Sequence, residues 1–125
     1  MRILIIEDDA FLRRAYEVGL RGQGFEVHAA ADGEIGISMA AMNPPEAILL
    51  DILMPALSGV RVLERLKQNP AVARVPVVVL SNACTADEAQ GILAMGASAY
   101  LSKTGASMAD IGQTIRGLCP VSKYE

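Results

Sequence analysis

Short, unbroken apolar runs alternate with longer amphipathic stretches along this sequence, and that alternation constrains the fold more than any other feature. The runs are too short for helices and consist mainly of β-branched or aliphatic residues, which is typical of strands buried on both faces of a parallel sheet. Three clear runs occupy residues 3–6, 47–50 and 77–80, and two weaker ones occupy residues 25–30 and 99–102. The sequence therefore predicts five strands.

Amphipathic stretches follow the runs, and each predicts a helix with one buried face. In chain order, we expect these faces to contain Phe11, Ala15, Val18 and Gly19; Ile35, Met39 and Ala40; Gly59, Val62, Leu63 and Leu66; Ile92 and Leu93; and Met108, Ile111, Ile115 and Leu118. Asp32 is a candidate N-cap of the second helix. The spacings Thr85 to Glu88 and Ser107 to Asp110 match capping boxes at the start of the fourth and fifth helices.

Strands and helices in strict alternation predict an α/β fold, a single doubly wound (βα)5 domain. Right-handed crossovers place helices on both faces of a parallel sheet. In such folds, ligands bind at the carboxyl ends of the strands, near the point where the strand order reverses. No repeat or linker divides the 125 residues, so we expect one domain over residues 1–125.

Composition and charge narrow the class of protein. A composition of 52% hydrophobic and 20% charged residues is typical of a folded protein. The net charge of −3 does not indicate the basic surface of a nucleic-acid-binding domain. The first apolar run stops at Glu7, which excludes a signal peptide or membrane span there. We therefore expect a cytoplasmic protein with reduced thiols at Cys84 and Cys119, and His28 at the surface or on an edge strand.

Polar side chains follow the apolar runs at the positions where the strands should end. They are Glu7, Asp8 and Asp9 after the first run, Asp51 after the third, Ser81 and Asn82 after the fourth, and Ser102 and Lys103 after the fifth. Converging carboxylates repel and raise one another's pKa values unless a cation offsets them. Both Mg²⁺ and the Lys103 ammonium suit that role, because Mg²⁺ prefers oxygen ligands and retains waters and phosphate oxygens.

This arrangement suits phosphoryl transfer. A carboxylate such as Asp51, beside Mg²⁺ and Lys103, is placed for in-line attack on a phosphoryl donor, and Ser81 can donate to an equatorial oxygen. Each residue alone has a simpler interpretation: Asp9 as a helix N-cap, Lys103 as a surface charge, Ser81 as a turn residue. Their joint occurrence at successive strand ends favours the functional interpretation.

Four segments resemble receiver domains of two-component response regulators. They are ILIIEDD at residues 3–9, LLDILMPALSG at residues 49–59, VVVLS at residues 77–81 and GASAYLSK at residues 96–103. The pattern Asp-x-x-Met-Pro-x-x-x-Gly, from Asp51 to Gly59, is the most specific of them. The resemblance covers nearly the whole chain and implies a flavodoxin-like fold with strand order 2-1-3-4-5.

The resemblance implies a role for each matching residue. Asp51 matches the phosphoacceptor, Lys103 the lysine that pairs with the phosphoryl group, and Ser81 the hydroxyl that moves toward it. Tyr100 matches the aromatic switch residue, which turns inward as Ser81 moves. Mg²⁺ would be held by Glu7 through a water, by Asp8, by Asp51 and by the backbone carbonyl of Leu53. Pro55 and Gly59 would shape the loop after the phosphoacceptor.

The function so implied is that of a phosphorylation-dependent signalling switch. A histidine kinase or phosphotransfer protein would phosphorylate Asp51, and the change would be read at the face of the fourth helix, fifth strand and fifth helix. The chain would not be an enzyme beyond Mg²⁺-dependent self-phosphorylation and self-dephosphorylation. Its output would need a partner or a C-terminal effector domain that these residues do not contain, and we expect no direct contact with nucleic acid or membrane.

Four positions depart from the family pattern, and two other functions compete. Thr104 replaces a proline that usually forms a cis peptide bond, and Asn82 replaces a small residue, which would alter access of water or donor to the aspartyl phosphate. Leu53 and Ala83 are apolar at positions that tune dephosphorylation, so fast, water-assisted turnover is not expected. A phosphatase with an aspartyl-phosphate intermediate would normally carry an aspartate two residues after the nucleophile, where this chain has Leu53. A degenerate receiver that acts only in docking would not need the intact acidic, hydroxyl and lysine residues.

Overall fold

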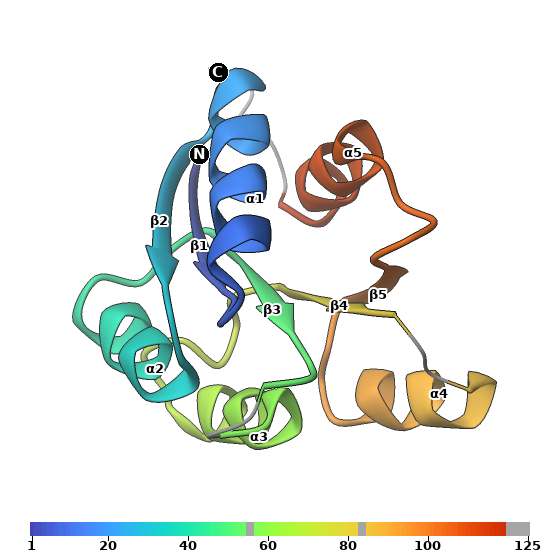
Figure 1. Cartoon of the computed structure of the whole chain (residues 1–125). Helices are drawn as coiled ribbons and strands as arrows, with labels where there is room; N and C mark the ends of the chain where they lie inside the picture. The colour runs from blue at the N-terminus through green and yellow to red at the C-terminus, as the bar shows by residue number, and fades with distance from the viewer. Residues whose placement is uncertain (55–56, 83–84, 120–125) are drawn as a thin grey trace.

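The structure is a computed structural model, and it describes residues 1–54, 57–82 and 85–119. Five strands alternate with five helices, as the sequence predicts (Figure 1). In chain order the elements are β1 (Arg2–Ile6), α1 (Ala10–Gly22), β2 (Glu26–Ala30), α2 (Gly33–Met42), β3 (Ala47–Asp51), α3 (Gly59–Gln68), β4 (Val77–Ser81), α4 (Ala86–Ala94), β5 (Ala99–Ser102) and α5 (Met108–Leu118). None of the described helices is long and apolar enough to cross a membrane.

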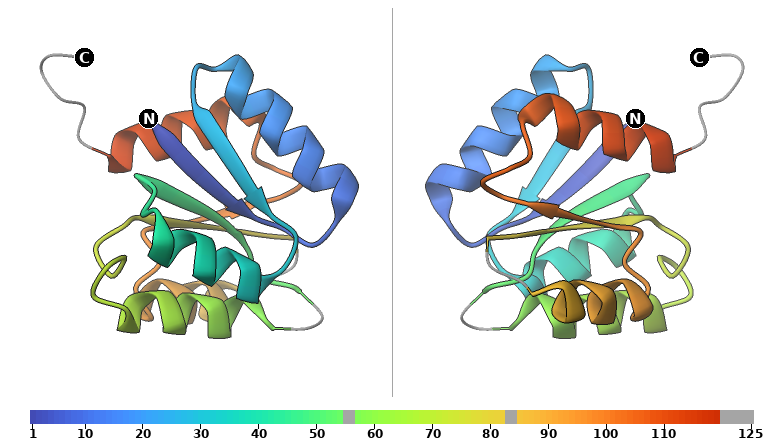
Figure 2. Two further views of the ribbon diagram at one scale, coloured as in Figure 1. Left: turned by 90° about the vertical axis from the view of Figure 1, so that its left-hand side faces the viewer. Right: turned by 90° about the vertical axis from the view of Figure 1, so that its right-hand side faces the viewer.

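All strand pairs are parallel, and the strand order β2-β1-β3-β4-β5 confirms the expected flavodoxin-like, doubly wound topology. The helices form two layers: α1 and α5 cover one face of the sheet, and α2, α3 and α4 cover the other (Figure 2). Strand order reverses between β1 and β3, so a crevice is expected at the carboxyl ends of these two strands.

Two apolar cores fill the spaces between the sheet and the helix layers, because successive side chains of a strand point to opposite faces. Toward α2, α3 and α4 lie Leu4, Ile6, Ile48, Leu50, Val77 and Val79, packed on Ala40, Val62, Leu63, Leu66 and Ile92. Toward α1 and α5 lie Ile3, Ile5, Val27, Leu49, Val78 and Leu80, packed on Tyr16, Leu20, Ile111 and Ile115. The strands are therefore buried on both sides and hold their carboxyl ends rigidly.

Capping residues begin the helices where the sequence indicates. The side chains of Asp9 and Asp32 accept hydrogen bonds from backbone N–H groups in the first turns of α1 and α2. Thr85 caps α4 in the same way, but the predicted box is incomplete, since the Glu88 carboxylate accepts from the Thr85 hydroxyl. Ser107 and Asp110 complete a reciprocal capping box at α5, in which each side chain accepts from the other residue's backbone N–H.

The predicted buried face of α1 is wrong. Phe11 is 81% and Val18 55% exposed, whereas Tyr16 and Leu20 are buried. Apolar residues occupy two adjacent stripes of this helix, and the stripe that contains Tyr16 and Leu20 packs on the core beside α5. Helical periodicity alone does not choose between two such stripes, since both recur at intervals of three and four residues.

Two smaller corrections concern α2 and α4. Ile35 is exposed because the sheet side of α2 is formed by Gly36 and Ala40. A Cβ at Gly36 would lie 2.6 Å from Cδ1 of Ile6, so the helix backbone approaches β1 closely at this position. In α4 only Ile92 is buried, and its neighbour Leu93 points outward. The buried faces predicted for α3 and for the centre of α5 are confirmed.

His28 lies on an edge strand, as predicted, and the thiol of Cys119 is free, as expected of a reduced cysteine. His28 is on the edge strand β2, and its Nε2 lies 3.2 Å from an oxygen of Glu26. Cys119 is a free, buried thiol that donates a hydrogen bond to the backbone carbonyl of Glu46. Cys84 lies outside the described residues, so its pairing stays a prediction.

Candidate functional site

Two acidic side chains meet at the crevice between β1 and β3. Ile6 pairs with Leu50 in the sheet register, so the next residues along the two strands, Glu7 and Asp51, emerge side by side. Glu7 is 2% and Asp51 3% exposed, which is rare for carboxylates unless a partner compensates them. The sequence prediction that these strand ends converge is therefore confirmed.

Asp8 joins this pair to form an acidic cluster. One carboxylate oxygen from each of Glu7, Asp8 and Asp51 lies within 4.8 Å of the others. The donor atoms are all hard oxygens, which Mg²⁺ and Ca²⁺ prefer, and the cluster holds more negative charge than the surrounding cations offset. The residues present therefore fit a divalent cation.

Lys103 supplies the nearest positive charge. Its backbone N–H donates to the Ser81 carbonyl at 3.1 Å, which fixes the start of the loop after β5. Its ammonium nitrogen lies 2.9 Å from Oε1 of Glu7 and 3.1 Å from Oδ1 of Asp51, and its side chain is 11% exposed. One largely buried cation thus bridges two buried carboxylates, which agrees with the prediction that Lys103 offsets their charge.

Burial and crowding change the proton affinity of these groups. Burial, reinforced by the neighbouring Asp51 and opposed by Lys103, raises the pKa of Glu7 to about 7. For Lys103, burial acts to lower the pKa, but hydrogen bonds to Glu7 and Asp51 outweigh it and the pKa is raised. Near neutral pH, Lys103 is therefore charged, whereas Glu7 gains and loses its proton in this pH range.

Ser81 and Tyr100 occupy neighbouring strands beside the cluster. Ser81 ends β4, is buried, and pairs in register with Ser102. Tyr100 is partly buried on β5 and packs against the core beneath α2, α3 and α4. The structure thus places the Ser81 hydroxyl in the row of strand ends, whereas Tyr100 lies further back along its strand.

The loop after Asp51 is held close to the acidic cluster. The backbone N–H of Leu53 donates to Oδ1 of Asp51 at 3.1 Å, and the Leu53 side chain is exposed. The N–H of Gly59 donates to the Ile52 carbonyl at 3.0 Å, and a Cβ at Gly59 would collide with the Ile52 backbone. Glycine at this position is therefore required by close approach. Pro55 lies outside the described residues.

Two features near the cluster are not predicted from the sequence. Arg13 of α1 donates to the backbone carbonyls of Glu7 at 3.0 Å and Asp8 at 3.3 Å, which ties the helix to the acidic segment. The sequence does contain a signal for this contact. Arg13 comes four residues after the N-cap Asp9, and a long basic side chain at the start of a helix can reach back to the carbonyls of the preceding strand end. The hydroxyl of Tyr16 is buried nearby, and this burial raises its pKa.

Thr104 follows Lys103 at the position where the family usually has proline. No described residue forms a cis peptide bond. The Thr104 hydroxyl lies 3.1 Å from the hydroxyl of Ser102, and Ser102 also accepts a hydrogen bond from the N–H of Gly105. The loop that carries the lysine is therefore stabilised by hydroxyl contacts in place of a proline ring.

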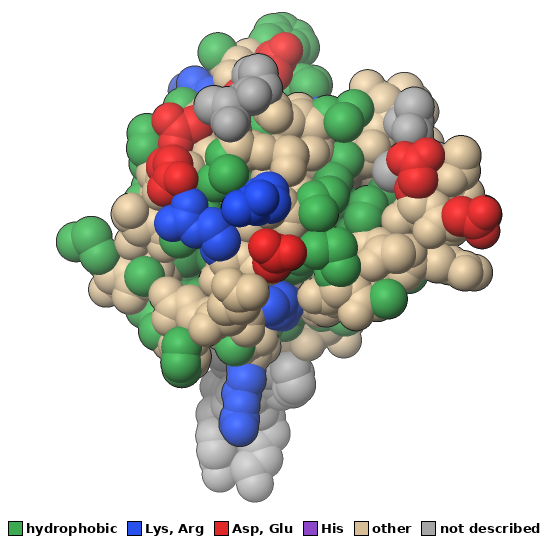
Figure 3. Space-filling view, turned by 90° about the horizontal axis from the view of Figure 1, so that it is seen from below, with side chains coloured by type: hydrophobic (Ala, Val, Ile, Leu, Met, Phe, Trp, Pro, Cys, Tyr) green, Lys and Arg blue, Asp and Glu red, His purple; other side chains and the backbone are tan. Residues whose placement is uncertain are grey.

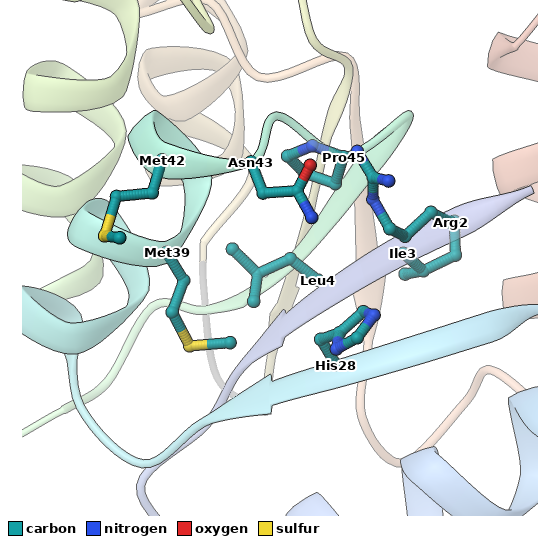
Figure 4. A pocket seen from close by; sticks show the side chains of 8 residues that line it. All are labelled: Arg2, Ile3, Leu4, His28, Met39, Met42, Asn43 and Pro45. Carbon is teal, nitrogen blue, oxygen red and sulfur yellow. The ribbon is translucent and has the colours of Figure 1, made fainter.

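A separate pocket of about 170 Å³ lies around the first residues of β1, away from the acidic cluster (Figure 4). Met39 and Met42 of α2 line one side, and Arg2 and His28 lie on the other side (Figure 4). None of the acidic-cluster residues lines this pocket. The chemistry of the molecule is therefore concentrated at the opposite, carboxyl end of the strands.

Comparisons with known proteins agree with this geometry. The sequence is 42% identical over 102 residues to the transcriptional regulatory protein PrrA of Mycobacterium tuberculosis, a match that covers 82% of this chain and 43% of PrrA. It is 36% identical over 118 residues to the transcriptional regulatory protein QseB of Haemophilus influenzae, covering 94% of this chain and 52% of QseB. The chain thus spans about half, or less, of these relatives.

A solved structure and a family match point the same way. The receiver domain of a sensor histidine kinase from Pseudomonas aeruginosa, which has a magnesium ion coordinated in its active-site cleft, matches with a TM-score of 0.86. That match has 25% sequence identity and covers 96% of this chain and 98% of the other. Residues 3–116 match the response regulator receiver domain family. With the strand order and the acidic cluster already described, this match establishes that the chain belongs to the response regulator receiver domain family.

Proposed function

We propose that this chain is a phosphorylation-dependent switch of a two-component system, which accepts a phosphoryl group on Asp51. The observation that carries the proposal is the placement of the buried Asp51 carboxylate against the largely buried Lys103 ammonium group, within an acidic cluster that fits a divalent cation. A carboxylate so placed is a nucleophile whose product, a dianionic phosphoryl group, finds a cation already in position.

Each residue of the cluster has a part in the transfer. An oxygen of Asp51 attacks phosphorus in line, the bond from phosphorus to the donor breaks, and the donor group leaves with its electron pair. Mg²⁺, when bound, neutralises charge on the phosphoryl oxygens. Glu7, Asp8, Asp51 and the Leu53 carbonyl are the proposed ligands. The Lys103 ammonium group would form an ion pair with the phosphoryl oxygens, and the Ser81 hydroxyl would donate a hydrogen bond to one of them.

The proposed donor is a histidine kinase or a histidine phosphotransfer protein. Residues 1–125 would act as one receiver domain, and the output would come from a partner protein or an effector domain. Movement of Ser81 and Tyr100 would carry the change to the face formed by α4, β5 and α5. The position two residues after Asp51 carries no acid, which disfavours a phosphatase that turns over small molecules. Cytoplasmic location and the absence of nucleic-acid binding stay predictions.

The proposal is tested with a small phosphodonor. The protein is incubated with acetyl phosphate, with Mg²⁺ or with EDTA, and its intact mass is measured. We expect one phosphoryl adduct on the wild type with Mg²⁺, none with EDTA, and none on Asp51→Asn.

The matched control is Asp9→Asn, because Asp9 caps α1 and asparagine preserves that cap. This variant should form the adduct as the wild type does. An unmodified wild type at every donor concentration, or an equal adduct on Asp51→Asn, would refute the proposal.

A further inference from the structure

A cavity of about 410 Å³ opens between the start of α3 and the side of α4, next to the phosphoacceptor loop. We call it the α3–α4 pocket. Its lining residues are Ile52, Leu53, Ser58, Val60, Ser81, Glu88, Gly91, Ile92 and Met95. The volume and the mainly apolar wall with a few polar groups are those of small-molecule sites. It also lies near the carboxyl ends of β3 and β4, where ligands bind in doubly wound folds.

Figure 3 views the face that carries this pocket. Hydrophobic side chains form a band beside basic and acidic side chains at the centre, and further acidic side chains lie toward the right-hand edge, where α4 lies. Leu53, one of the lining residues, is exposed although it is a large apolar residue. The pocket is therefore an apolar surface that nothing within the described residues covers.

No contact with a described residue explains Gly91, and the same holds for Gly117 in α5, but only Gly91 lines the pocket. Gly91 is exposed in the interior of α4, where glycine is less favourable than alanine, and a Cβ there would meet no atom within 4 Å. Gly112 in α5 differs, because a Cβ there would collide with Gln23. Because glycine has no side chain, Gly91 lets a ligand in the pocket approach the α4 backbone closely.

Glu88 gives the pocket its charge. Among the described residues that line the cavity, it alone carries a carboxylate or a basic group. Its carboxylate accepts a hydrogen bond from the Thr85 hydroxyl at 3.2 Å, and no ion pair between described residues involves it. An exposed carboxylate at the edge of an apolar cavity selects a positively charged group beside an apolar one.

We propose that the α3–α4 pocket binds a small molecule with an apolar, ring-sized body and one amine. The apolar body would fill the space between Ile52, Val60 and Ile92, pass close to Gly91, and place its ammonium group at Glu88. The polar side chains of Ser58 and Ser81 complete the wall. This binding does not depend on phosphorylation of Asp51, so it stands or fails separately from the proposed function.

The test is a titration followed by amide chemical shifts of the ¹⁵N-labelled protein. The probe is naphthylmethylamine, and its neutral and anionic counterparts are naphthylmethanol and naphthylacetate. We expect saturable shifts at Val60, Gly91 and Ile92, with affinity in the order amine, alcohol, acid. In Glu88→Gln, which keeps the hydrogen bond to Thr85, the amine should bind no better than the alcohol.

Two glycine variants provide the matched comparison. Gly91→Ala and Gly117→Ala both add a methyl group that meets no atom of a described residue within 4 Å, and both favour the helix. Only Gly91 lines the pocket. Gly91→Ala should weaken binding of the amine about tenfold, whereas Gly117→Ala should change it less than about twofold.

Three results of the titrations would overturn the proposal. These are the absence of saturable shifts at the pocket, equal binding by the two glycine variants, and equal binding of amine and acid. A second copy of the chain is the alternative occupant of the pocket. Analytical ultracentrifugation of the unliganded protein tests for it by measuring self-association. Self-association that Gly91→Ala abolishes and Gly117→Ala preserves would assign the pocket to a dimer interface and reject the small molecule.

Discussion

The ammonium nitrogen of Lys103 lies 3.1 Å from Oδ1 of Asp51, although β4 separates the strands that lead to the two residues. The lysine therefore reaches across the end of a strand to meet the carboxylate. It meets Glu7 in the same way at 2.9 Å. This bridge makes two adjacent buried carboxylates compatible with a stable fold, and it places a cation where a phosphoryl group on Asp51 would sit.

Removal of the bridging charge should destabilise the protein. Lys103→Met keeps a long side chain but leaves Glu7 and Asp51 buried without their cation. We expect the free energy of unfolding to fall by about 3 kcal/mol, as when one partner of a buried ion pair is removed. Urea denaturation at neutral pH measures this loss, and Mg²⁺ should restore part of it.

Arg65→Met is the matched control for that loss. Arg65 lies 2.7 Å from Glu34, closer than Lys103 lies to either carboxylate, but both side chains are exposed. An exposed pair contributes less than about 1 kcal/mol. If the two variants lost equal stability, the burial of the Lys103 bridge would not be the source of its strength.

Glu7 should make stability depend on pH. Its pKa is raised from 4.5 to about 7, so between these values the folded state binds more protons than the unfolded state. Stability from this group is full below about pH 4.5 and is lost as the pH rises through about 7, by at most about 3 kcal/mol. Denaturation of wild type and Glu7→Gln at about pH 5 and about pH 8 tests this dependence. A wild-type decline no steeper than that of the variant would contradict it.

Gly59, the buried first residue of α3, should be harder to replace than an exposed helical glycine. In Gly59→Ala the new methyl group would collide with the Ile52 backbone, which cannot move without shifting the loop after Asp51. We expect a loss of about 2–3 kcal/mol in unfolding free energy, typical of overpacking against backbone. Gly22→Ala, where a Cβ meets nothing within 4 Å, should be neutral or stabilising in the same thermal or urea denaturation experiment.

The strand ends could be predicted from sequence because two independent signals agree there. An apolar run fixes where each strand lies, and the polar residue that follows it marks the carboxyl end, so Glu7, Asp51 and Lys103 are located by position alone. The caps Asp9, Asp32 and Ser107 were predictable for the same local reason, since a cap depends on residues within one turn.

The errors arise where the decision depends on tertiary packing. In α1, Phe11 and Val18 form one apolar stripe and Tyr16 and Leu20 another, and only the docking angle on the sheet selects the second. In α2, the close approach of Gly36 to Ile6 turns Ile35 outward. The contacts of Arg13 with two backbone carbonyls likewise depend on how α1 leaves β1.

The most direct measurement of the central claim locates the modified residue. After incubation with acetyl phosphate and Mg²⁺, the protein is treated with borohydride, which reduces an aspartyl phosphate to homoserine, and is then digested and sequenced by mass spectrometry. We expect homoserine at position 51 alone, dependent on Mg²⁺ and absent from Asp51→Asn. Homoserine at another acidic residue, or none in a protein that carries the phosphoryl mass, would contradict the assignment of Asp51.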